Sequence, residues 1–307
     1  MTNPSHQIAR EELFAVLDSY LAALRERDCN AVPWAQDAKI SENGVMLRAG
    51  QGAWVSLTGL DKFDLRFCDT SAGEVGHFGV LDESGDRSPF ALRLRVAEGL
   101  VAEAEMVVAR PLDCGTPFLN ADLVDRPVLL ETLAPRDRTD RAEMIRLADG
   151  YFSTLERNDG TIKTVFDPSC DRRENGTYTT NNESEHLGWI GGLSCEAQFR
   201  LGWFLFDDEL RARRYPLIDE ERGLLLAGAM IDHAGLHKSV TLTDGRTVIP
   251  VFRRPHSFNL LELFKIKAGR IEAIEAVFHT VPYRMPSPWS GADGAGHDRD
   301  LAQEASR

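Results

Sequence analysis

The sequence lacks the motifs by which many cofactor-dependent and hydrolytic enzymes are recognised. It contains no G-x-G-x-x-G, no Walker phosphate-binding loop, no G-x-S-x-G elbow and no H-E-x-x-H. Nucleotide, flavin and serine-hydrolase mechanisms therefore have no support in the residues, and we expect an activity that needs no cofactor.

Long apolar runs are also missing. The longest, LLLAGAMI from Leu224, is far too short to cross a bilayer, and the start, MTNPSHQIAREELF, has no apolar core of the kind found in signal peptides. We therefore expect a cytoplasmic protein with no membrane-spanning segment and no membrane partner.

Positive charge and paired cysteines are scarce. The 35 lysines and arginines face 48 aspartates and glutamates, the formal net charge is -13, and no basic stripe offsets it. A phosphate backbone would be repelled, so nucleic acid is not expected as a partner. No C-x-x-C occurs. The cysteines are odd in number and widely spread, so we interpret them as reduced thiols: Cys29, Cys68, Cys114, Cys170 and Cys195.

What the sequence does contain is a repeated string. Glu-Asn-Gly occurs in AKISENGVML, which begins at Ala38, and again in CDRRENGTYT, which begins at Cys170. With 307 residues, of which 43% are hydrophobic, the chain is long enough for two domains with proper cores. The segments before the two strings also match. Four residues of the first segment align with four identical residues of the second: Asp18, Tyr20, Leu24 and Asp28 with Asp149, Tyr151, Leu155 and Asp159.

Each half is predicted to open with an amphipathic helix. Apolar residues recur at helical spacing between Leu13 and Leu24 and again between Ile145 and Leu155. Asp140 followed by Glu143 resembles a capping box at the start of the second helix. We therefore predict a first domain over 1–132, a second over 133–289 and a flexible tail over 290–307.

The correspondence continues beyond Glu-Asn-Gly. Asp69 and Gly73 align with Asp219 and Gly223, and two predicted hairpins, RLRVAEGLVAEAE and LFKIKAGRIEAIE, turn at glycine. The second half has longer insertions, around YTTNNESEHLGWIGG and DHAGLHKSVTLTDGRTV, and such loops often carry function. Each half thus reads as a helix followed by a curved antiparallel sheet.

This pattern resembles the nuclear transport factor 2-like (SnoaL-like) superfamily. The resemblance rests on the opening helix, on Glu-Asn-Gly entering the first strand and on the final hairpin, over roughly 8–110 and 140–285. It implies an α+β fold made of two tandem cone-shaped barrels, in which a curved antiparallel sheet wraps around helices and leaves a pocket at the wide end. It also implies a spread of activities, from cofactor-free isomerases, dehydratases, epoxide hydrolases, polyketide cyclases and lignin-dimer lyases to members that only bind.

Two glutamates of the second predicted hairpin are candidates for acid–base chemistry. If Ala268 and Gly269 form a two-residue loop, Glu262 faces Glu275 on a largely apolar surface. Two adjacent carboxylates raise one pKa, as a general acid or base near neutral pH requires. The alternative is that an arginine neutralises both on a covered face.

Asp232 and His233 end an apolar strand where a cone mouth is expected. His233 can transfer protons near pH 7, although a solvated loop position is the alternative. Together with His186, His237, His256 or His279 it has the residue types of a metal site, but Gly235 interrupts the spacing and we predict no metal.

Aromatic and basic side chains supply the other candidates. Tyr178, which follows Glu-Asn-Gly, Tyr283 and Arg214 are candidate stabilisers of a developing anion. For the arginines of RARRYP, the alternative is simple pairing with Asp207, Asp208 and Glu209. The expected substrate-binding residues are Tyr151, Trp189, Trp203, Asp232, His279 and Glu275. In the first half, His77 and Asp69 are the best candidates, and we expect that half to act chiefly as a packing partner.

The sequence therefore predicts an acid–base lyase, dehydratase or isomerase for a hydrophobic, aromatic small molecule such as a lignin-derived dimer, polyketide or steroid-like compound. His233 or Glu262 would be the base. The rival functions are a non-catalytic binding or assembly protein and a metal-dependent enzyme. A homo-oligomer is compatible with any of them.

Overall fold

The computed structural model describes residues 8–111 and 119–290. Of the predicted features, Cys114 and all of the tail except Ser290 lie outside this part of the chain. Cys29, Cys68, Cys170 and Cys195 are free thiols. No helix in the described ranges is long and apolar enough to cross a membrane.

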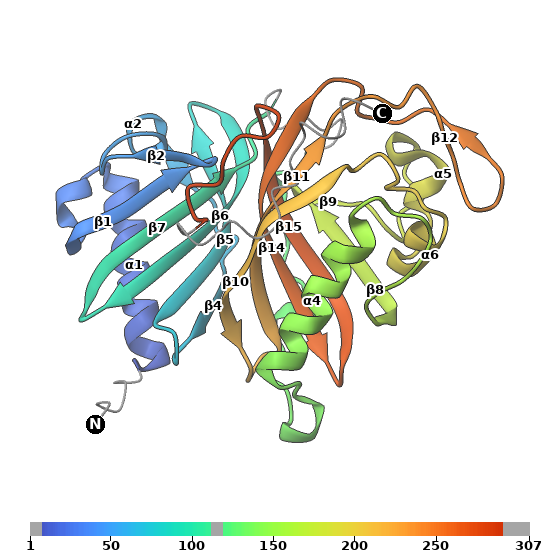
Figure 1. Cartoon of the computed structure of the whole chain (residues 1–307). Helices are drawn as coiled ribbons and strands as arrows, with labels where there is room; N and C mark the ends of the chain where they lie inside the picture. Colours follow the sequence, from blue (N-terminus) through green and yellow to red (C-terminus); the bar gives the residue numbers. More distant parts are fainter. Residues whose placement is uncertain (1–7, 112–118, 291–307) are drawn as a thin grey trace.

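The first half consists of one long helix and a curved sheet of seven strands (Figure 1). Its elements are α1 (Arg10–Glu26), η1 (Cys29–Ala31), β1 (Trp34–Glu42), β2 (Val45–Leu47), α2 (Ala53–Ser56), β3 (Gly59–Leu60), β4 (Leu65–Asp69), β5 (Glu74–Glu83), β6 (Asp86–Ala97) and β7 (Leu100–Val108). The strand order is β2-β1-β7-β6-β5-β3, with β4 also paired to β5.

The second half repeats this order with additions. Its elements are α3 (Pro127–Leu130), η2 (Pro135–Asp137), α4 (Arg141–Leu155), β8 (Phe166–Glu174), β9 (Thr177–Tyr178), η3 (Glu185–Leu187), α5 (Gly188–Gly191), α6 (Cys195–Arg200), β10 (Glu209–Asp219), β11 (Leu224–His233), β12 (Val240–Thr241), β13 (Thr247–Val248), β14 (His256–Lys267) and β15 (Arg270–Val281). The main sheet runs β10-β11-β14-β15-β8-β9. The predicted α+β class with two curved-sheet units is confirmed, but the sheets are mixed, because β1 pairs with β7 and β8 with β15 in parallel.

The long helices bury the predicted apolar stripes. Leu13, Leu17, Tyr20 and Leu24 of α1 are buried in the first core. In α4 the predicted residues Ala148, Tyr151, Phe152 and Leu155 are buried, whereas Ile145 is only partly buried and Met144 is buried in its place. The predicted cap is present, with the Asp140 side chain accepting from the Glu143 backbone N–H at 2.9 Å.

Each Glu-Asn-Gly string ends the first strand of its half, rather than entering it as predicted. The positive φ angles of Asn43 and Gly44 (50° and 77°) and of Asn175 and Gly176 (46° and 83°) make a tight turn. Asn43 Nδ2 donates to the Val108 carbonyl at 3.2 Å while its Oδ1 accepts from the Val108 N–H at 2.8 Å. Asn175 makes the same two bonds to Phe278, at 3.2 and 2.9 Å. The string recurs because the same turn is fastened to the same strand in both halves.

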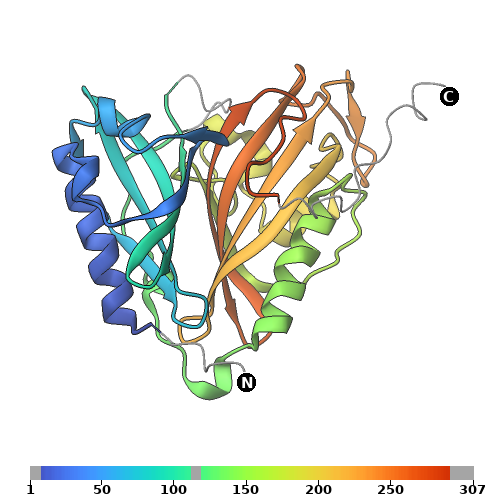
Figure 2. The same cartoon turned by 60° about the vertical axis from the view of Figure 1, so that its left-hand side comes forward.

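The two sheets lie against each other in the middle of the molecule, with α1 and α4 on the outer sides (Figure 2). Both sheets contribute to the cluster between them, which includes Phe67 and Phe78 from one and Leu226 and Leu261 from the other. A sheet that buries both faces explains why nearly every residue of β5 and β11 is buried.

Two buried aspartates link the halves in the same way. Asp219, at the end of β10, accepts from Arg10 at 2.6 Å, while Asp69, at the end of β4, accepts from Arg141 at 2.6 Å. Each arginine begins the long helix of the opposite half. Asp69, a site candidate, is thus a structural residue, and His77 packs on Phe90 beside Asp64.

Candidate active site

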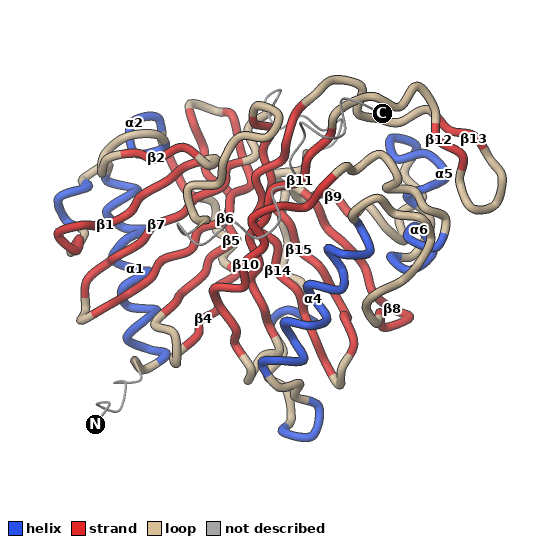
Figure 3. Tube along the Cα trace, viewed as in Figure 1, coloured by secondary structure: helices blue, strands red, loops and turns tan. Residues whose placement is uncertain are grey.

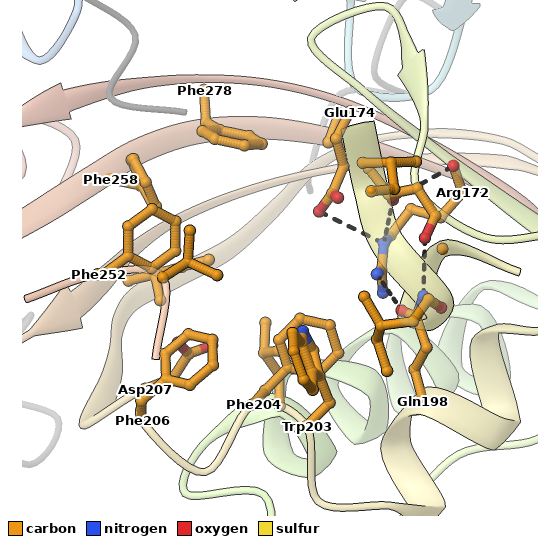
Figure 4. A pocket seen from close by; sticks show the side chains of 18 of the residues that line it. Arg172, Glu174, Gln198, Trp203, Phe204, Phe206, Asp207, Phe252, Phe258 and Phe278 are labelled. Carbon is orange, nitrogen blue, oxygen red and sulfur yellow. Dashed lines mark hydrogen bonds and ion pairs between the residues drawn. The ribbon is translucent and has the colours of Figure 1, made fainter. Parts of the chain in front are cut away.

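A cavity of about 310 Å³ lies inside the second half. Its walls come from α4, β8, β11, β14 and β15 and from the two insertions of the second half. The lining is largely aromatic and apolar: Tyr151, Trp189, Trp203, Phe204, Phe206, Val251, Phe252, Phe258, Leu260 and Phe278. Figure 4 shows the rings of Trp203, Phe204, Phe206, Phe252, Phe258 and Phe278 around an open centre, with Arg172, Glu174 and Gln198 on one side and Asp207 on the other.

The first polar side is built on β8, β14 and α4. Strand alternation points Arg172 and Glu174 of β8 and Glu262 of β14 into the cavity. The Arg172 guanidinium donates to Gln198 at 2.6 Å, to Thr179 at 3.1 Å and to the Tyr151 hydroxyl at 3.4 Å. Its Nε lies 3.4 Å from a Glu174 oxygen, so these two charges offset each other.

The protonation of Glu262 follows from this setting. Burial raises the pKa of its carboxyl to about 8; Glu174 adds to the rise, and Arg172 and the Tyr151 hydroxyl oppose it. Burial likewise raises the pKa of the Tyr151 hydroxyl. At neutral pH, Glu262 is therefore a proton donor held among aromatic walls.

The second polar side is a buried histidine–aspartate pair. His233, the last residue of β11, places Nε2 2.8 Å from Asp207 Oδ1, and both side chains are almost fully buried. Burial raises the pKa of Asp207, and the adjacent His233 opposes that rise. His256 stacks on His233 with ring centroids 4.6 Å apart. His233 Nδ1 has no hydrogen-bond partner in the described part of the chain.

Five of the predicted site residues meet at this cavity. They are His233, Glu262, Tyr151, Trp189 and Trp203. Trp189 and Trp203 contact each other edge to face, and Trp189 is half-exposed at the rim. The other six candidates lie elsewhere.

Glu275 does not face Glu262, contrary to the prediction. Lys267 pairs with Arg270 as expected, but a bulge at Glu272 shifts the register, so Glu262 faces Ala276 and Glu275 faces Leu263. A shift of one residue turns every later side chain to the other face. Glu275 instead lies between the sheets, where it binds Arg173 at 2.7 Å and Arg126 at 3.0 Å.

Arg214 and Asp232 are also outside the cavity. Arg214 reaches across to the first half and pairs with Glu105. Asp232 is fully buried on the opposite side of β11 from His233, where it accepts two bonds from Arg211 and one from Ser257. The alternative predicted that these arginines pair with Asp207, Asp208 and Glu209. Arg211 and Arg214 instead pair with Asp232 and Glu105.

Tyr178, Tyr283 and His279 complete the corrections. The Tyr178 ring lies under the guanidinium groups of Arg126 and Arg173, away from the cavity. Tyr283 follows β15, and His279 comes directly after the cavity-lining Phe278, so alternation turns it to the other face.

The sequence reasoning missed Arg172, Glu174, Gln198 and Asp207, although the repeat held a signal for one of them. Aligning the two Glu-Asn-Gly strings places Arg172 on Ile40, a buried residue of the first core. A charge where the other half has a core isoleucine indicates a site. Asp207 and Gln198 lie in an insertion with no counterpart, so the alignment says nothing of them.

The predicted histidine set does not form a metal site. Of the five histidines, His233 and His256 are stacked, whereas His237 is exposed on a loop and His279 is on the other face. The described residues include no group of three or more His, Cys, Asp or Glu side chains placed to hold a metal ion.

The fold and cavity define an α+β protein with two curved-sheet units, one of them hollow. The chain belongs to the family described as a domain of unknown function, DUF8021, whose model matches residues 6–108 and 137–278. No curated protein matches the sequence.

Several solved structures resemble part of the chain. An NTF-2 like protein of unknown function from Burkholderia xenovorans is 12% identical, covering 34% of this chain and 87% of its own, with a TM-score of 0.28. An LEH-like epoxide hydrolase from M. tuberculosis is 17% identical, covering 32% and 83%, with a TM-score of 0.25. A putative ketosteroid isomerase from Kribbella flavida is 17% identical, covering 42% and 96%, with a TM-score of 0.28.

Proposed function

We propose that the second-half cavity is the active site of a cofactor-independent enzyme that moves protons on a neutral, apolar small molecule with aromatic rings. Isomerisation and elimination, including dehydration and lyase chemistry, are the reaction classes. The observation that carries the proposal is the almost fully buried Glu262 carboxyl, with its pKa raised to about 8, in the same cavity as a buried histidine.

The two polar sides suit complementary roles. We assign proton removal to His233, because its ring lines the cavity and Asp207 Oδ1, 2.8 Å from its Nε2, offsets the positive charge that the ring gains. Glu262 carries a proton at neutral pH and donates it to the substrate atom that gains electron density. One proton leaves the substrate and one arrives, so no net charge is left on it. If the Glu262 proton goes to a departing hydroxyl, the same pair performs an elimination.

The charges of the cavity also favour a neutral substrate. Arg172 is offset by Glu174, and Asp207 faces His233, so an ionic ligand would find no uncompensated partner. Rings such as Phe252, Phe258 and Phe278 offer apolar and edge-to-face contacts instead. The volume of about 310 Å³ suits a molecule of a few fused or linked rings.

We also infer that the halves are copies of one ancestral unit. The strand registers support this, because Leu92 pairs with Met106 in the first sheet as Glu262 pairs with Ala276 in the second, at aligned positions. The second copy then gained its charged interior and its insertions.

Solvent-deuterium incorporation tests the function before the natural substrate is known. A panel of neutral aromatic ketones and alcohols is incubated with the protein in heavy water, and mass spectrometry follows deuterium entering carbon positions or the loss of water. We expect exchange or turnover with a subset of the panel, reduced about 10²- to 10⁴-fold in His233→Asn and in Glu262→Gln. His279→Asn, on the opposite face of the sheet, is the matched control and should retain activity.

A binding protein would behave differently. Panel members would bind to the wild-type protein and to both variants, as measured by calorimetry, while the wild type would show neither exchange nor turnover. A metal-dependent enzyme would lose its activity in chelator and regain it on addition of a metal ion.

A further inference from the structure

The second insertion of the second half forms a projecting ribbon, defined here as residues 234–255 between β11 and β14. Its two arms run antiparallel, since Val240 pairs with Val248 and Thr241 with Thr247. Figures 1 and 3 show β12 and β13 extending from the body beside α5. Thr243 fastens the ribbon to the end of α6 through bonds to the Leu201 and Arg200 carbonyls, at 3.1 and 2.8 Å.

The ribbon exposes large apolar side chains. Leu236 is 79% exposed, Ile249 60% and Val251 52%, and Trp189 of the adjacent α5 is 46% exposed. Leu236 lies on one arm and Ile249 and Val251 on the other, and the arms approach again where Gly235 lies against the backbone of Arg253 and Arg254. Water-exposed apolar groups gathered in this way mark an interaction site.

The same ribbon concentrates positive charge in an acidic protein. It carries Lys238, Arg246, Arg253 and Arg254 against one carboxylate, Asp244, whereas the whole chain has a net charge of -13. Arg246 pairs with Asp244 and lies 3.8 Å from the centre of the Trp189 ring. Lys238, Arg253 and Arg254 are exposed and form no ion pair with any described residue.

The ribbon also forms one wall of the cavity mouth. Val251 and Trp189 both line the cavity and are half-exposed, so the opening lies between the ribbon and α5. The apolar surface outside is therefore continuous with the apolar lining inside.

We propose that this ribbon docks the protein on an anionic lipid surface, with the cavity mouth facing the lipid. Leu236, Ile249 and Val251 enter the apolar boundary while Lys238, Arg253 and Arg254 contact the headgroups, the combination that gives peripheral binding. The rest of the protein is acidic, so the anionic headgroups repel it and it faces away from the lipid. The use of this orientation rests on the proposed function, because a substrate of linked rings partitions into lipid and would pass directly into the cavity.

This proposal revises the expectation that no membrane partner exists. Composition averages charge over the whole chain, whereas the ribbon alone carries four basic residues against one carboxylate. A second copy could also bring acidic residues to the ribbon, but it would cover the cavity mouth. Lipid both matches the alternation of apolar and basic side chains and leaves a route for the substrate.

Vesicle flotation tests the proposal without any measurement of turnover. The full chain is mixed with phosphatidylcholine vesicles that contain or lack phosphatidylglycerol. We expect binding to the anionic vesicles that decreases with added salt, and we expect it to fall about tenfold or more in Arg253→Gln/Arg254→Gln and in Leu236→Ser/Ile249→Ser. The matched control is Val55→Ser/Val124→Ser, which removes two equally exposed apolar side chains away from the ribbon and should bind like the wild type.

The outcomes separate this proposal from its rivals and from the function itself. No flotation of the wild type, or flotation unaffected by either ribbon variant, overturns it. Self-association in sedimentation that the ribbon variants abolish, without vesicle binding, would assign the surface to a second copy and also overturn it. Should a ribbon variant fail to fold, the salt and phosphatidylglycerol dependence of the wild type still decides. Vesicle binding by a protein with no proton-transfer activity would contradict the proposed function only.

Discussion

The two halves place different residues on the same framework. Ile40 and Leu92 of the first half occupy the strand positions of Arg172 and Glu262 in the second, since Ile40 pairs with Ala104 as Arg172 pairs with Ile274. Both apolar residues are buried in a core where Tyr20 packs against two tryptophans at 5.4 and 5.9 Å. The equivalent Tyr151 touches four phenylalanines and still lines a cavity. A few inward-facing positions and two insertions thus separate a packing unit from a candidate site.

Exchanging one aligned residue should break the comparison most strongly. Leu92→Glu puts a carboxyl into a core with no arginine at the Ile40 position, so we expect a loss of about 4 kcal/mol in the free energy of unfolding. The reciprocal Glu262→Leu removes a buried acid and should leave stability unchanged or raise it by about 1 kcal/mol, while abolishing turnover. Urea unfolding of both variants checks this, and equal losses in the two would contradict it.

The pH dependence of stability should next distinguish the Glu262 position from its apolar counterpart, Leu92. The pKa of Glu262 is raised to about 8 by burial, so the folded state binds this proton more tightly than the unfolded state, whose carboxyl titrates near 4.5. The stability it contributes is present below pH 4.5 and is lost as pH rises towards 8. Glu262→Gln should remove this loss, a difference on the order of 5 kcal/mol at pH 9. Thermal unfolding from pH 5 to 9 measures it, and parallel pH curves for variant and wild type would contradict it.

The smallest expected effect tests what the halves share. Asn43→Ala removes two hydrogen bonds to β7, and Asn175→Ala removes two to β15. Each variant also places alanine at a positive φ. We expect each to cost about 2 kcal/mol, with Asn175 costing more because it is fully buried. Denaturant titrations measure the loss in the free energy of unfolding. A negligible loss for only one of the two variants would contradict the expectation that the matching bonds contribute similar stability.

The sequence could reveal those features that depend on local pattern. The helical stripes, the Asp140 cap, the tight turn at Ala268–Gly269 and the alignment of Asp69 with Asp219 all appear in the structure. His233 and Glu262 were found because one ends an apolar strand and the other is a charge within one. Asn43 and Asn175 have nearly the same role, because each has a positive φ and makes the same two bonds to a neighbouring strand.

The rest depended on long-range geometry. A single bulged residue, Glu272, decided that Glu275 lies between the sheets rather than in the cavity, and nothing in the alternation predicts it. Arg214 finds Glu105 only because the sheets pack together, and Asp207 meets His233 only because an insertion folds back over β11.

The exchanged arginines have a consequence for dissecting the molecule. Arg10 forms an ion pair with Asp219, and Arg141 forms one with Asp69. The start of each long helix is therefore bound to the sheet of the other half. A fragment carrying the hollow half alone would keep Asp219 but lose its counterion, and its interior leucines, including Leu226 and Leu261, would meet solvent. Cutting the chain at its middle should therefore yield insoluble material rather than a minimal catalyst.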